Sequence, residues 1–411
     1  MNSKFLKKYA GLHCCAILIA VTTSAAGQAG KLDNTFGNGG IATQQTTVIR
    51  TSNFYAVGAV AMQTDGKIVV VGGVPGNNDF TVPAVLRFLT NGSLDKTFAV
   101  NGVFVPPNTF GSYAAVAIQS DGKILLGTSA GGPNAEVDRL TTAGLLDSSF
   151  GSGGRVTFKL SALLGMALQP DGRILAGVHS IIGGQSQVAR LLSSGSRDSS
   201  FGTNGFAVPP GGAGPMEVLG NGDILVFGGL ISRLASSGAI DTTFGVNGQL
   251  LAQTSGHASA ADGDILVAGT LSSNPAVPSS GLAAFSYLSV GIGDPTFGKN
   301  GGALTAFPGF PTVGAVGMGL ESTGDIVELG TVSNTTASVF GLVRFTSLGQ
   351  LDTSFGTGGV VTTSFGNNAT TNAAAIAIQT DDKIVVAGTV TTPALHGEFN
   401  TALVIARYLA K

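Results

Sequence analysis

The stretch LVRFTSLGQLDTSFGTGGVV, residues 342–361, decides the fold, because its pattern recurs along most of the chain. It places Arg344 in an apolar run, Asp352 eight residues later, and Phe355-Gly356 before a second apolar run. A repeated unit of this kind predicts an array of similar structural modules. The same spacing from Arg to Asp occurs at Arg87–Asp95, Arg139–Asp147, Arg190–Asp198 and Arg233–Asp241.

One further copy and two half copies complete the series. Ser286 replaces the Arg in one copy, and Asp294 still follows eight residues later. Near the start, Asp33 in LDNTFGNGG has no Arg before it, and near the end Arg407 has no Asp after it. Because the two halves complement each other, the pattern predicts a closed ring in which the first residues complete the last unit.

A second marker lies between these units. Its fullest form begins QTDGKIVV at Gln63, and Asp-Gly between two apolar runs is a strong hairpin signal because both turn positions favour positive φ. Successive copies are 41–61 residues apart along the sequence. The seven turns begin at Asp65, Asp121, Asp171, Asn221, Asp262, Thr323 and Asp381.

Each copy predicts four short strands, which in the first copy are residues 59–63, 67–71, 84–88 and 103–105. Four strands at this period are typical of a propeller blade. Small residues such as Ala59 and Ala61 place the first strand beside the central channel, and the uniformly apolar second strand is expected to be covered on both faces. We therefore predict an all-β, seven-bladed β-propeller of four-stranded blades. Residues 40–43 should pair with residues 403–408 and complete the last blade.

The first 26 residues have the pattern of a secretory signal peptide. Three lysines precede an apolar stretch at 14–21, and Ser24 and Ala26 stand before the expected cut at Gly27. A transmembrane anchor is the alternative, but the stretch has less than half of the ~20 residues that a span needs. We expect a signal peptide at 1–26, a propeller at 27–411, and export to the periplasm or the exterior of a bacterium.

The composition argues against several classes of function. Cys14 and Cys15 are the only cysteines, so the chain after the signal has no disulfide and no cysteine metal site. The net charge is −2 and basic runs are absent, which argues against nucleic acid or anionic lipid as a partner. The absence of Trp weighs against a quinone-cofactor propeller and against Trp-lined sugar clefts. We predict no cofactor, no metal, no membrane span and a monomer.

The repeats LDNTFGNGG, LLDSSFGSGG and LDTSFGTGG, with AIQSDGKILLGT and AIQTDDKIVVAGT, resemble the delta-60 repeat family. The resemblance covers nearly the whole chain after the signal. It implies a bacterial exported protein with a propeller fold, and it implies no particular activity. The copy SYLSVGIGDPTFG departs most, since it lacks the Arg and has Gly293 where Leu is usual.

The recurring residues are predicted to form scaffold. Asp caps its own turn by accepting backbone N–H groups two residues on, Phe anchors the turn, and Gly permits a left-handed backbone. The fixed spacing to Arg suggests an ion pair or Arg-to-carbonyl bonding at the same turn. A motif that serves every repeat alike is more often structural than a metal or anion site.

Outside this scaffold the candidate site residues are few. Glu217 occupies an Ala-type position, Glu321 replaces the usual Gln, and Glu328 interrupts an apolar strand, where a lone carboxylate is costly unless paired or wetted. In the structural interpretation, each of these carboxylates is paired locally. In the functional interpretation, they mark a site, because ionisable groups at unusual positions often do so. Three histidines are assigned to loops of different copies, without a shared metal: His179, His257 and His396.

Loop lengths distinguish the two faces of the predicted ring. The first-to-second and third-to-fourth strand links are uniform, whereas the other two kinds of link, on the opposite face, carry the length variation. Binding residues usually lie on variable loops held by a rigid scaffold. The longer loops are 44–57, 73–83, 271–281, 306–312, 333–340 and 390–400.

The sequence favours an exported, non-catalytic scaffold that binds a protein, peptide or glycan through the variable face. No catalytic residue is assigned, and the ligand-binding residues are not identified. The alternative is a propeller hydrolase or lyase acting on a polysaccharide or ester through Glu217, Glu321 or Glu328, which requires converging carboxylates. A structural envelope component without a small ligand fits the sequence equally well.

Overall fold

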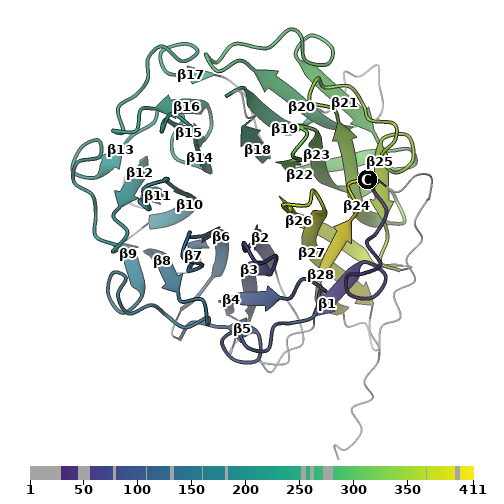
Figure 1. Cartoon of the computed structure of the whole chain (residues 1–411), viewed down its shortest axis with the longest axis horizontal. Coiled ribbons are helices and arrows are strands. Elements are labelled where there is room, and N and C mark those ends of the chain that lie inside the picture. The colour runs from purple at the N-terminus through teal and green to yellow at the C-terminus, as the bar shows by residue number, and fades with distance from the viewer. Residues whose placement is uncertain are drawn as a thin grey trace, which may run out of the picture.

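Seven four-stranded antiparallel sheets are arranged as blades around a central opening (Figure 1). The chain is described by a computed structural model at residues 29–44, 56–76, 80–107, 109–129, 134–159, 161–180, 184–250, 256–259, 263–271, 281–366, 368–393 and 399–411. The signal-peptide prediction at 1–26 therefore lies outside the described residues, as does the turn predicted at Asp262. None of the described residues forms a helix long and apolar enough to cross a membrane.

Each blade runs from an inner strand beside the opening to an outer strand at the rim (Figure 1). Blade 1 comprises β2 (Ala56–Met62), β3 (Ile68–Pro75), β4 (Thr81–Phe88) and β5 (Val103–Phe104). Blade 2 comprises β6 (Ser112–Ile118), β7 (Ile124–Ser129), β8 (Asn134–Leu140) and β9 (Arg155–Lys159). Blade 3 comprises β10 (Ser161–Leu168), β11 (Ile174–Ser180), β12 (Ser186–Leu191) and β13 (Phe206–Ala207).

The remaining blades follow the same order. Blade 4 comprises β14 (Met216–Val218), β15 (Ile224–Phe227), β16 (Ile231–Leu234) and β17 (Gln249–Leu250). Blade 5 comprises β18 (Gly256–Ser259), β19 (Ile265–Leu271), β20 (Gly281–Tyr287) and β21 (Gly302–Ala306). Blade 6 comprises β22 (Thr312–Leu320), β23 (Ile326–Ser333), β24 (Ser338–Phe345) and β25 (Val360–Thr363). Blade 7 comprises β26 (Thr370–Ile378), β27 (Ile384–Pro393), β28 (Phe399–Tyr408) and β1 (Ile41–Gln44).

The seventh blade confirms the predicted ring closure. Strand β1 pairs antiparallel with β28, with Ile41 opposite Ala406 and Gln44 opposite Leu403. Asp33 meets Arg407, whose Nε donates to Asp33 Oδ2 at 2.9 Å. The two half copies at the chain ends thus form one complete unit, and the outer edge of β28 is covered by strand pairing.

The predicted order of strands within a blade is also confirmed. The second strand of blade 1 is fully buried, from Ile68 to Val71, as expected for a strand packed between neighbouring blades. The inner strands of five blades contain a β-bulge that the sequence did not predict, as between Val57 and Ala59. A bulge bends a strand and increases its twist, and here it lies in the strand beside the opening.

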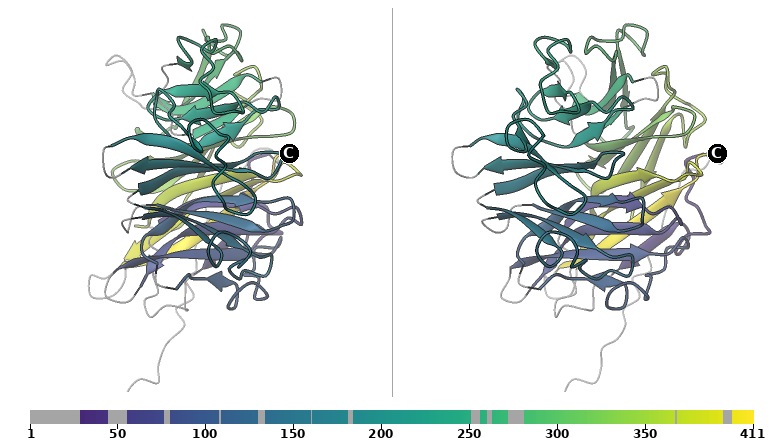
Figure 2. Two further views of the ribbon diagram at one scale, coloured as in Figure 1. Left: turned by 90° about the vertical axis from the view of Figure 1, so that its left-hand side faces the viewer. Right: turned by 60° about the vertical axis from the view of Figure 1, so that its left-hand side comes forward.

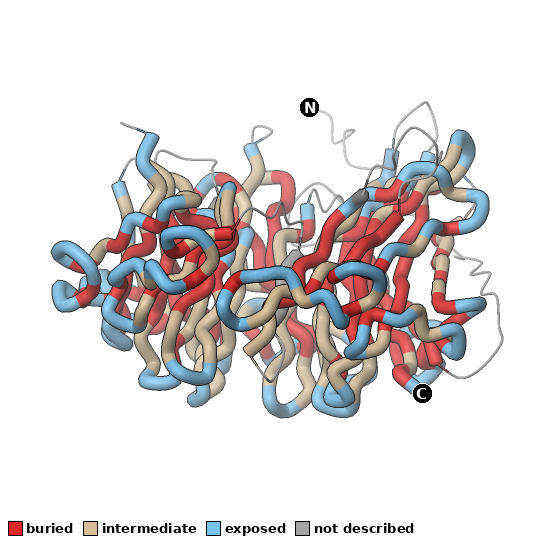
Figure 3. The backbone as a smooth tube through the Cα atoms, turned by 90° about the horizontal axis from the view of Figure 1, so that it is seen from above, coloured by how far each residue is buried: buried red, intermediate tan, exposed pale blue. Residues whose placement is uncertain are grey.

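The hydrophobic core is divided into seven clusters, one at each junction between adjacent blades. At the junction of blades 7 and 1, for example, Val385 and Leu403 pack with Ile68 and Val70. Buried segments accordingly run through the middle of the ring, and exposed segments lie towards its two faces (Figure 3). Stability therefore depends on how well neighbouring blades fit each other.

The strands run between the two faces of the disc (Figure 2). Because every neighbouring pair of strands in a blade is antiparallel, the Asp-Gly hairpins and the Arg–Asp links share one face, which we call the hairpin face. The other links form the opposite, loop face. Much of this loop face is undescribed: of the predicted long loops, only 306–312 and 333–340 are described throughout. The second prediction was too long, because β23 ends at Ser333 and β24 begins at Ser338.

Candidate functional site

The repeated Arg–Asp–Phe unit makes the same set of contacts in six blades. In blade 3, Arg190 Nε donates to Asp198 Oδ2 at 2.9 Å, and the guanidinium carbon lies 4.5 Å from the centre of the Phe201 ring. Asp198 Oδ1 accepts hydrogen bonds from the backbone N–H and the hydroxyl of Ser200. The predicted ion pair and turn cap are both confirmed. The other five pairs are Arg87–Asp95, Arg139–Asp147, Arg233–Asp241, Arg344–Asp352 and Arg407–Asp33.

Each of these arginines also reaches the next blade. Arg190 Nη1 donates to the carbonyl of Ser236 in blade 4 at 2.5 Å. Beside it, the Gly202 N–H donates to the carbonyl of Ser237 at 2.8 Å. The Phe201 ring packs on Gly238 of blade 4, where an added Cβ would lie 2.9 Å from the ring. The unit therefore fastens neighbouring blades together, and we call the Arg contacts the arginine clasp.

Substitution Arg190→Ala should destabilise the ring by about 3 kcal/mol. It removes the bond to the Ser236 carbonyl, and it leaves the buried Asp198 carboxylate with one cation, the more exposed Arg173, whose Nε lies 3.1 Å from Asp198 Oδ2. The Ser200 hydroxyl, its backbone N–H and the Arg190 charge together hold the pKa of Asp198 below its usual value. Urea unfolding at pH 7 measures the loss. Arg197→Ala, on the same turn but without a bond to Asp198, serves as the control. A loss of unfolding free energy below about 1 kcal/mol, which is typical of exposed ion pairs, would show that the arginine clasp does not stabilise the ring.

The three candidate glutamates do not come together. Glu217 lies on β14 in blade 4, whereas Glu321 and Glu328 belong to blade 6, with blade 5 between them. The sheet of blade 6 separates the latter two. Arg344, which binds Glu321, lies opposite Val327 in the neighbouring strand, so both side chains point to the same face of the sheet. Glu328 follows Val327 and therefore points to the other face, because adjacent residues of a strand point to opposite faces. One substrate could not contact all three carboxylates.

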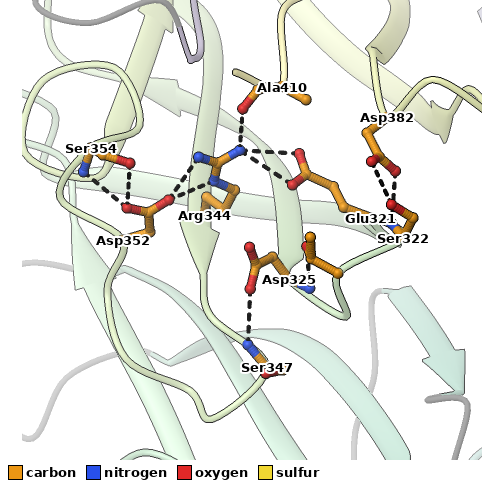
Figure 4. Close-up of polar contacts among 10 residues, drawn as sticks. Glu321, Ser322, Asp325, Arg344, Ser347, Asp352, Ser354, Asp382 and Ala410 are labelled. Carbon is orange, nitrogen blue, oxygen red and sulfur yellow. Dashed lines mark hydrogen bonds and ion pairs between the residues drawn. The ribbon is translucent and has the colours of Figure 1, made fainter.

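Glu321 belongs to a polar cluster that joins blade 6 to blade 7 (Figure 4). Its oxygens accept hydrogen bonds from Arg344 Nη1 at 3.2 and 3.3 Å, and the same nitrogen donates to the Ala410 carbonyl at 2.6 Å. Burial raises the pKa of Glu321 to about 7, although the Arg344 charge acts in the opposite direction. Close by, the backbone N–H and the hydroxyl of Ser322 donate to Asp382 of blade 7. These contacts are internal to the ring and support the structural interpretation of Glu321.

Glu328 on β23 is 0% exposed, and within the described part of the chain neither of its oxygens has a hydrogen-bond partner. It lies on the same face of the strand as Ile326, which packs with Leu266 and Leu282 of blade 5. Burial raises the pKa of Glu328 well above its usual value. The predicted local pairing of this carboxylate is therefore not found among the described residues. A group sealed in this way cannot contact a substrate.

Blade 2 contains a charged network that sequence reasoning missed. The fully buried Tyr113 on β6 donates its hydroxyl to Asp138 Oδ2 at 2.6 Å. Arg155 on β9 donates to both oxygens of Asp138, at 2.6 and 2.9 Å, and its Nη1 lies 3.0 Å from Glu136 Oε2. Burial, and then Asp138, raise the pKa of Tyr113 well above its usual value. The only sequence signal was that Asp138 and Glu136 stand outside both repeated markers.

The histidine assignments need correction. His179 lies in β11 and His257 in β18, so these two residues are in strands and were wrongly assigned to loops. His179 Nδ1 is 2.8 Å from the Ser186 hydroxyl. His396 lies outside the described residues. Among the described residues, no three His, Cys, Asp or Glu side chains gather in a way that could hold a metal ion.

The loop face presents aromatic side chains instead of converging charges. Phe80, in the link before β4, is 59% exposed, and Phe110, in the link before β6, is 52% exposed. Their rings meet edge to face with centres 5.5 Å apart, and the Gly111 N–H donates to the Thr81 carbonyl at 2.9 Å. Phe399 at the start of β28 is 63% exposed. On the same face, residues 306–311 line an open hollow of about 410 Å³.

Comparison with known proteins identifies the repeats. Residues 63–98, 119–150 and 169–201 match a family described as "Domain of unknown function (DUF5122) beta-propeller". The chain thus contains repeats of a β-propeller repeat family, and the more specific delta-60 name stays a prediction. A search of curated proteins gave no match.

Solved structures resemble the chain in fold. The Pan2 WD40 domain of Neurospora crassa shares 10% identity at a TM-score of 0.48, covering 94% of this chain and 98% of that one. YCF48 bound to D1 peptide shares 12% at 0.46, covering 93% and 100%. The PQQ-bound aldose sugar dehydrogenase of Streptomyces coelicolor shares 13% at 0.41, covering 72% and 94%. These neighbours have diverse roles, and likeness at this level carries no argument about function.

Proposed function

We propose that the protein is an exported, non-catalytic propeller that binds a peptide or protein segment through its loop face. The observation that supports this proposal is the exposed aromatic pair Phe80–Phe110. Aromatic side chains are enriched at protein interfaces, where they bury a large area at a small loss of side-chain entropy. A glycan is the other ligand class that the variable face could take, but the chain lacks Trp.

The pair is positioned by the blade scaffold. Phe80 and Phe110 come from links on either side of the junction between blades 1 and 2, and the bond from Gly111 N–H to the Thr81 carbonyl joins those links. Exposed aliphatic residues of the hairpin face, such as Leu145 and Leu348, lie on different blades. A preorganised aromatic pair loses little conformational freedom on binding, which favours it as the anchor of an interface.

Replacing both phenylalanines, Phe80→Ser with Phe110→Ser, should weaken binding of a captured partner at least tenfold. The partner would be selected from envelope proteins, random peptides and cell-surface glycans by display or array screening. Leu145→Ser with Leu348→Ser removes two exposed apolar side chains from the hairpin face and should leave affinity unchanged. Binding that survives the phenylalanine changes would refute the loop-face assignment, and selection of glycans alone would refute the peptide assignment.

Export rests on the sequence of residues 1–26. Expression of the whole chain in a Gram-negative bacterium should place a shortened protein outside the cytoplasm, and N-terminal sequencing should find Gly27 first. Deletion of residues 2–26 should retain the protein in the cytoplasm. An uncleaved chain that sediments with membranes would support the anchor instead.

The competing interpretation, a hydrolase or lyase, required carboxylates that converge on one substrate. Glu217 and Glu328 belong to different blades, Glu328 is sealed, and Glu321 is engaged by Arg344. The geometry of these three residues gives the competing interpretation no support. A structural envelope component would differ from the proposed binding module by giving no partner in the screen.

A further inference from the structure

The turns of blades 4, 5 and 6 expose apolar side chains on the hairpin face. The Gly245 N–H of blade 4 donates to the Val290 carbonyl of blade 5 at 2.8 Å, so Val246 lies beside Val290 across the junction. The exposed fractions range from 48% for Val290 to 72% for Val246. We call this surface the apolar rim, and its residues are Val246, Val290, Ile292 and Leu348.

The same three blades are acidic at a position where the other four are basic. This position follows the two-residue hairpin turn of each blade. Lys299 of blade 5 is exposed and offsets part of the acidic charge. The hairpin face nevertheless gains negative charge over blades 4 to 6. The residues at this position are Lys67, Lys123, Arg173 and Lys383 in blades 1, 2, 3 and 7, and Asp223, Asp264 and Asp325 in blades 4, 5 and 6.

The acidic side chains border the apolar rim. Asp264 Oδ1 accepts a hydrogen bond at 3.2 Å from the backbone N–H of Ser289, the residue before the rim in blade 5. Asp325 Oδ1 accepts one at 3.2 Å from the backbone N–H of Ser347, the residue before the rim in blade 6 (Figure 4). Apolar groups and carboxylates thus lie next to each other, and a segment with apolar and basic side chains is complementary to them.

Blades 1 and 2 provide a similar apolar surface in a different electrostatic setting. Val100 and Leu145 occupy the positions of Val246 and Ile292, and they are exposed to a similar extent. Lys123 stands there in place of the acidic residue. The two surfaces therefore share apolar side chains and differ in charge, which makes the surface of blades 1 and 2 a matched control.

We propose that the apolar rim and its bordering carboxylates bind a cationic amphipathic helix of a partner protein. A helix places residues i, i+3, i+4 and i+7 on one side, so its apolar side covers neighbouring turns while basic side chains reach the carboxylates. The carboxylates attract such a partner and repel acidic ones. A second copy of this chain has a net charge of −2 and no basic runs, so it matches the surface less well.

This surface lies on the hairpin face, whereas the function proposed above uses the loop face. The two proposals therefore fail separately. Phe80→Ser with Phe110→Ser should leave binding at the apolar rim unchanged, and variants of the rim should leave loop-face binding unchanged.

The experiment measures, by fluorescence anisotropy, binding of a labelled peptide of Leu and Lys with Leu at positions i, i+3, i+4 and i+7. We expect a Kd in the micromolar range, which rises with salt concentration because the attraction between exposed charges is screened. One control peptide has Glu in place of Lys, and another has Ser in place of Leu. Both should bind at least tenfold more weakly.

Variants of the protein locate the site. Val246→Ser with Ile292→Ser should weaken binding of the Leu–Lys peptide at least tenfold, because two apolar side chains are removed from the contact. Asp264→Asn with Asp325→Asn keeps an acceptor for the two turn N–H groups and should weaken binding severalfold by removing charge. The matched control, Val100→Ser with Leu145→Ser, should leave affinity unchanged.

The proposal is overturned if neither rim variant weakens binding, or if the control variant weakens it equally. Equal binding of the Glu-containing peptide would also overturn it, since the carboxylates would then play no part. Sedimentation of the protein alone provides a further test. Self-association that Val246→Ser with Ile292→Ser abolishes would assign the apolar rim to a second copy and overturn the proposal, whereas a monomer in both proteins supports it.

Discussion

Deletion of residues 29–44 should abolish cooperative folding of the whole ring. This segment supplies β1, the Asp33 partner of Arg407, and the fully buried Phe36. Leu32 packs in the core cluster between blades 6 and 7, and Phe36 in the cluster between blades 7 and 1. Each large buried side chain contributes about 2 kcal/mol, and loss of the ion pair adds about 3–5 kcal/mol. The total is comparable with the ~5–15 kcal/mol that stabilises an ordinary domain.

A circular permutant is the matched control. The Gly30 N–H donates to the Leu409 carbonyl at 2.8 Å, so a short linker can join Lys411 to Ala29 while a new N-terminus opens before β2. The permutant keeps every contact of the segment and should unfold in one transition, measured by circular dichroism and calorimetry. A deletion variant that unfolds as sharply as the permutant would show that β1 is dispensable for closure.

Glu328→Val should stabilise the protein by about 2–4 kcal/mol at pH 7. The substitution removes a buried polar group that has no hydrogen-bond partner among the described residues. It also introduces the residue type that other blades have at the equivalent position, where blade 1 has Val70 and blade 7 has Val386. Glu328→Gln should gain less, because it keeps an unsatisfied polar group. Denaturant unfolding of the three proteins measures the difference.

The gain should depend on pH in a defined direction. The pKa of Glu328 is raised well above its usual value in the fold, so the folded protein holds a proton that the unfolded chain releases above about pH 4.5. Unfolding free energy therefore falls as pH rises, by up to about 1.4 kcal/mol per unit. Glu321 acts with the same sign between about pH 4.5 and 7, since burial raises its pKa to about 7.

The two carboxyl groups can be separated by variants. Glu328→Val should flatten the decline of stability with pH, and Glu321→Gln should remove only the part below about pH 7. The double variant should have the flattest profile. An unchanged profile in Glu328→Val would show that this carboxyl group is solvated or paired in solution.

The sequence predicted the fold because its signals are local. Each signal spans a short stretch of the chain and predicts one strand or one link. These signals are the Asp-Gly turns, the Arg-to-Asp spacing and the two half copies. Even ring closure was predictable, because Asp33 and Arg407 are halves of one recognisable unit. The inner-strand bulges were missed, since no residue type marks the extra position.

Contacts across a junction were less accessible to sequence reasoning. The spacing indicated that Arg190 bonds to Asp198, but it did not show that Arg190 also bonds to the Ser236 carbonyl of the next blade. Asp138 and Glu328 are both buried carboxylates that break an apolar pattern. One accepts three hydrogen bonds from Tyr113 and Arg155, and the other accepts none among the described residues. Which donors meet a carboxylate depends on side chains of other strands, and the repeat pattern does not encode them.

The closure of blade 7 also sets an order of assembly. Asp33 and Arg407 are 374 positions apart, whereas each other Arg–Asp pair is separated by 8. Bringing the distant ends together requires about 3 kcal/mol more loop-closure entropy, so this contact forms last. Until then the free edge of β28 is open to the β1 of another molecule. Refolding at high protein concentration should therefore give domain-swapped dimers, in which the β1 of each molecule completes blade 7 of the other.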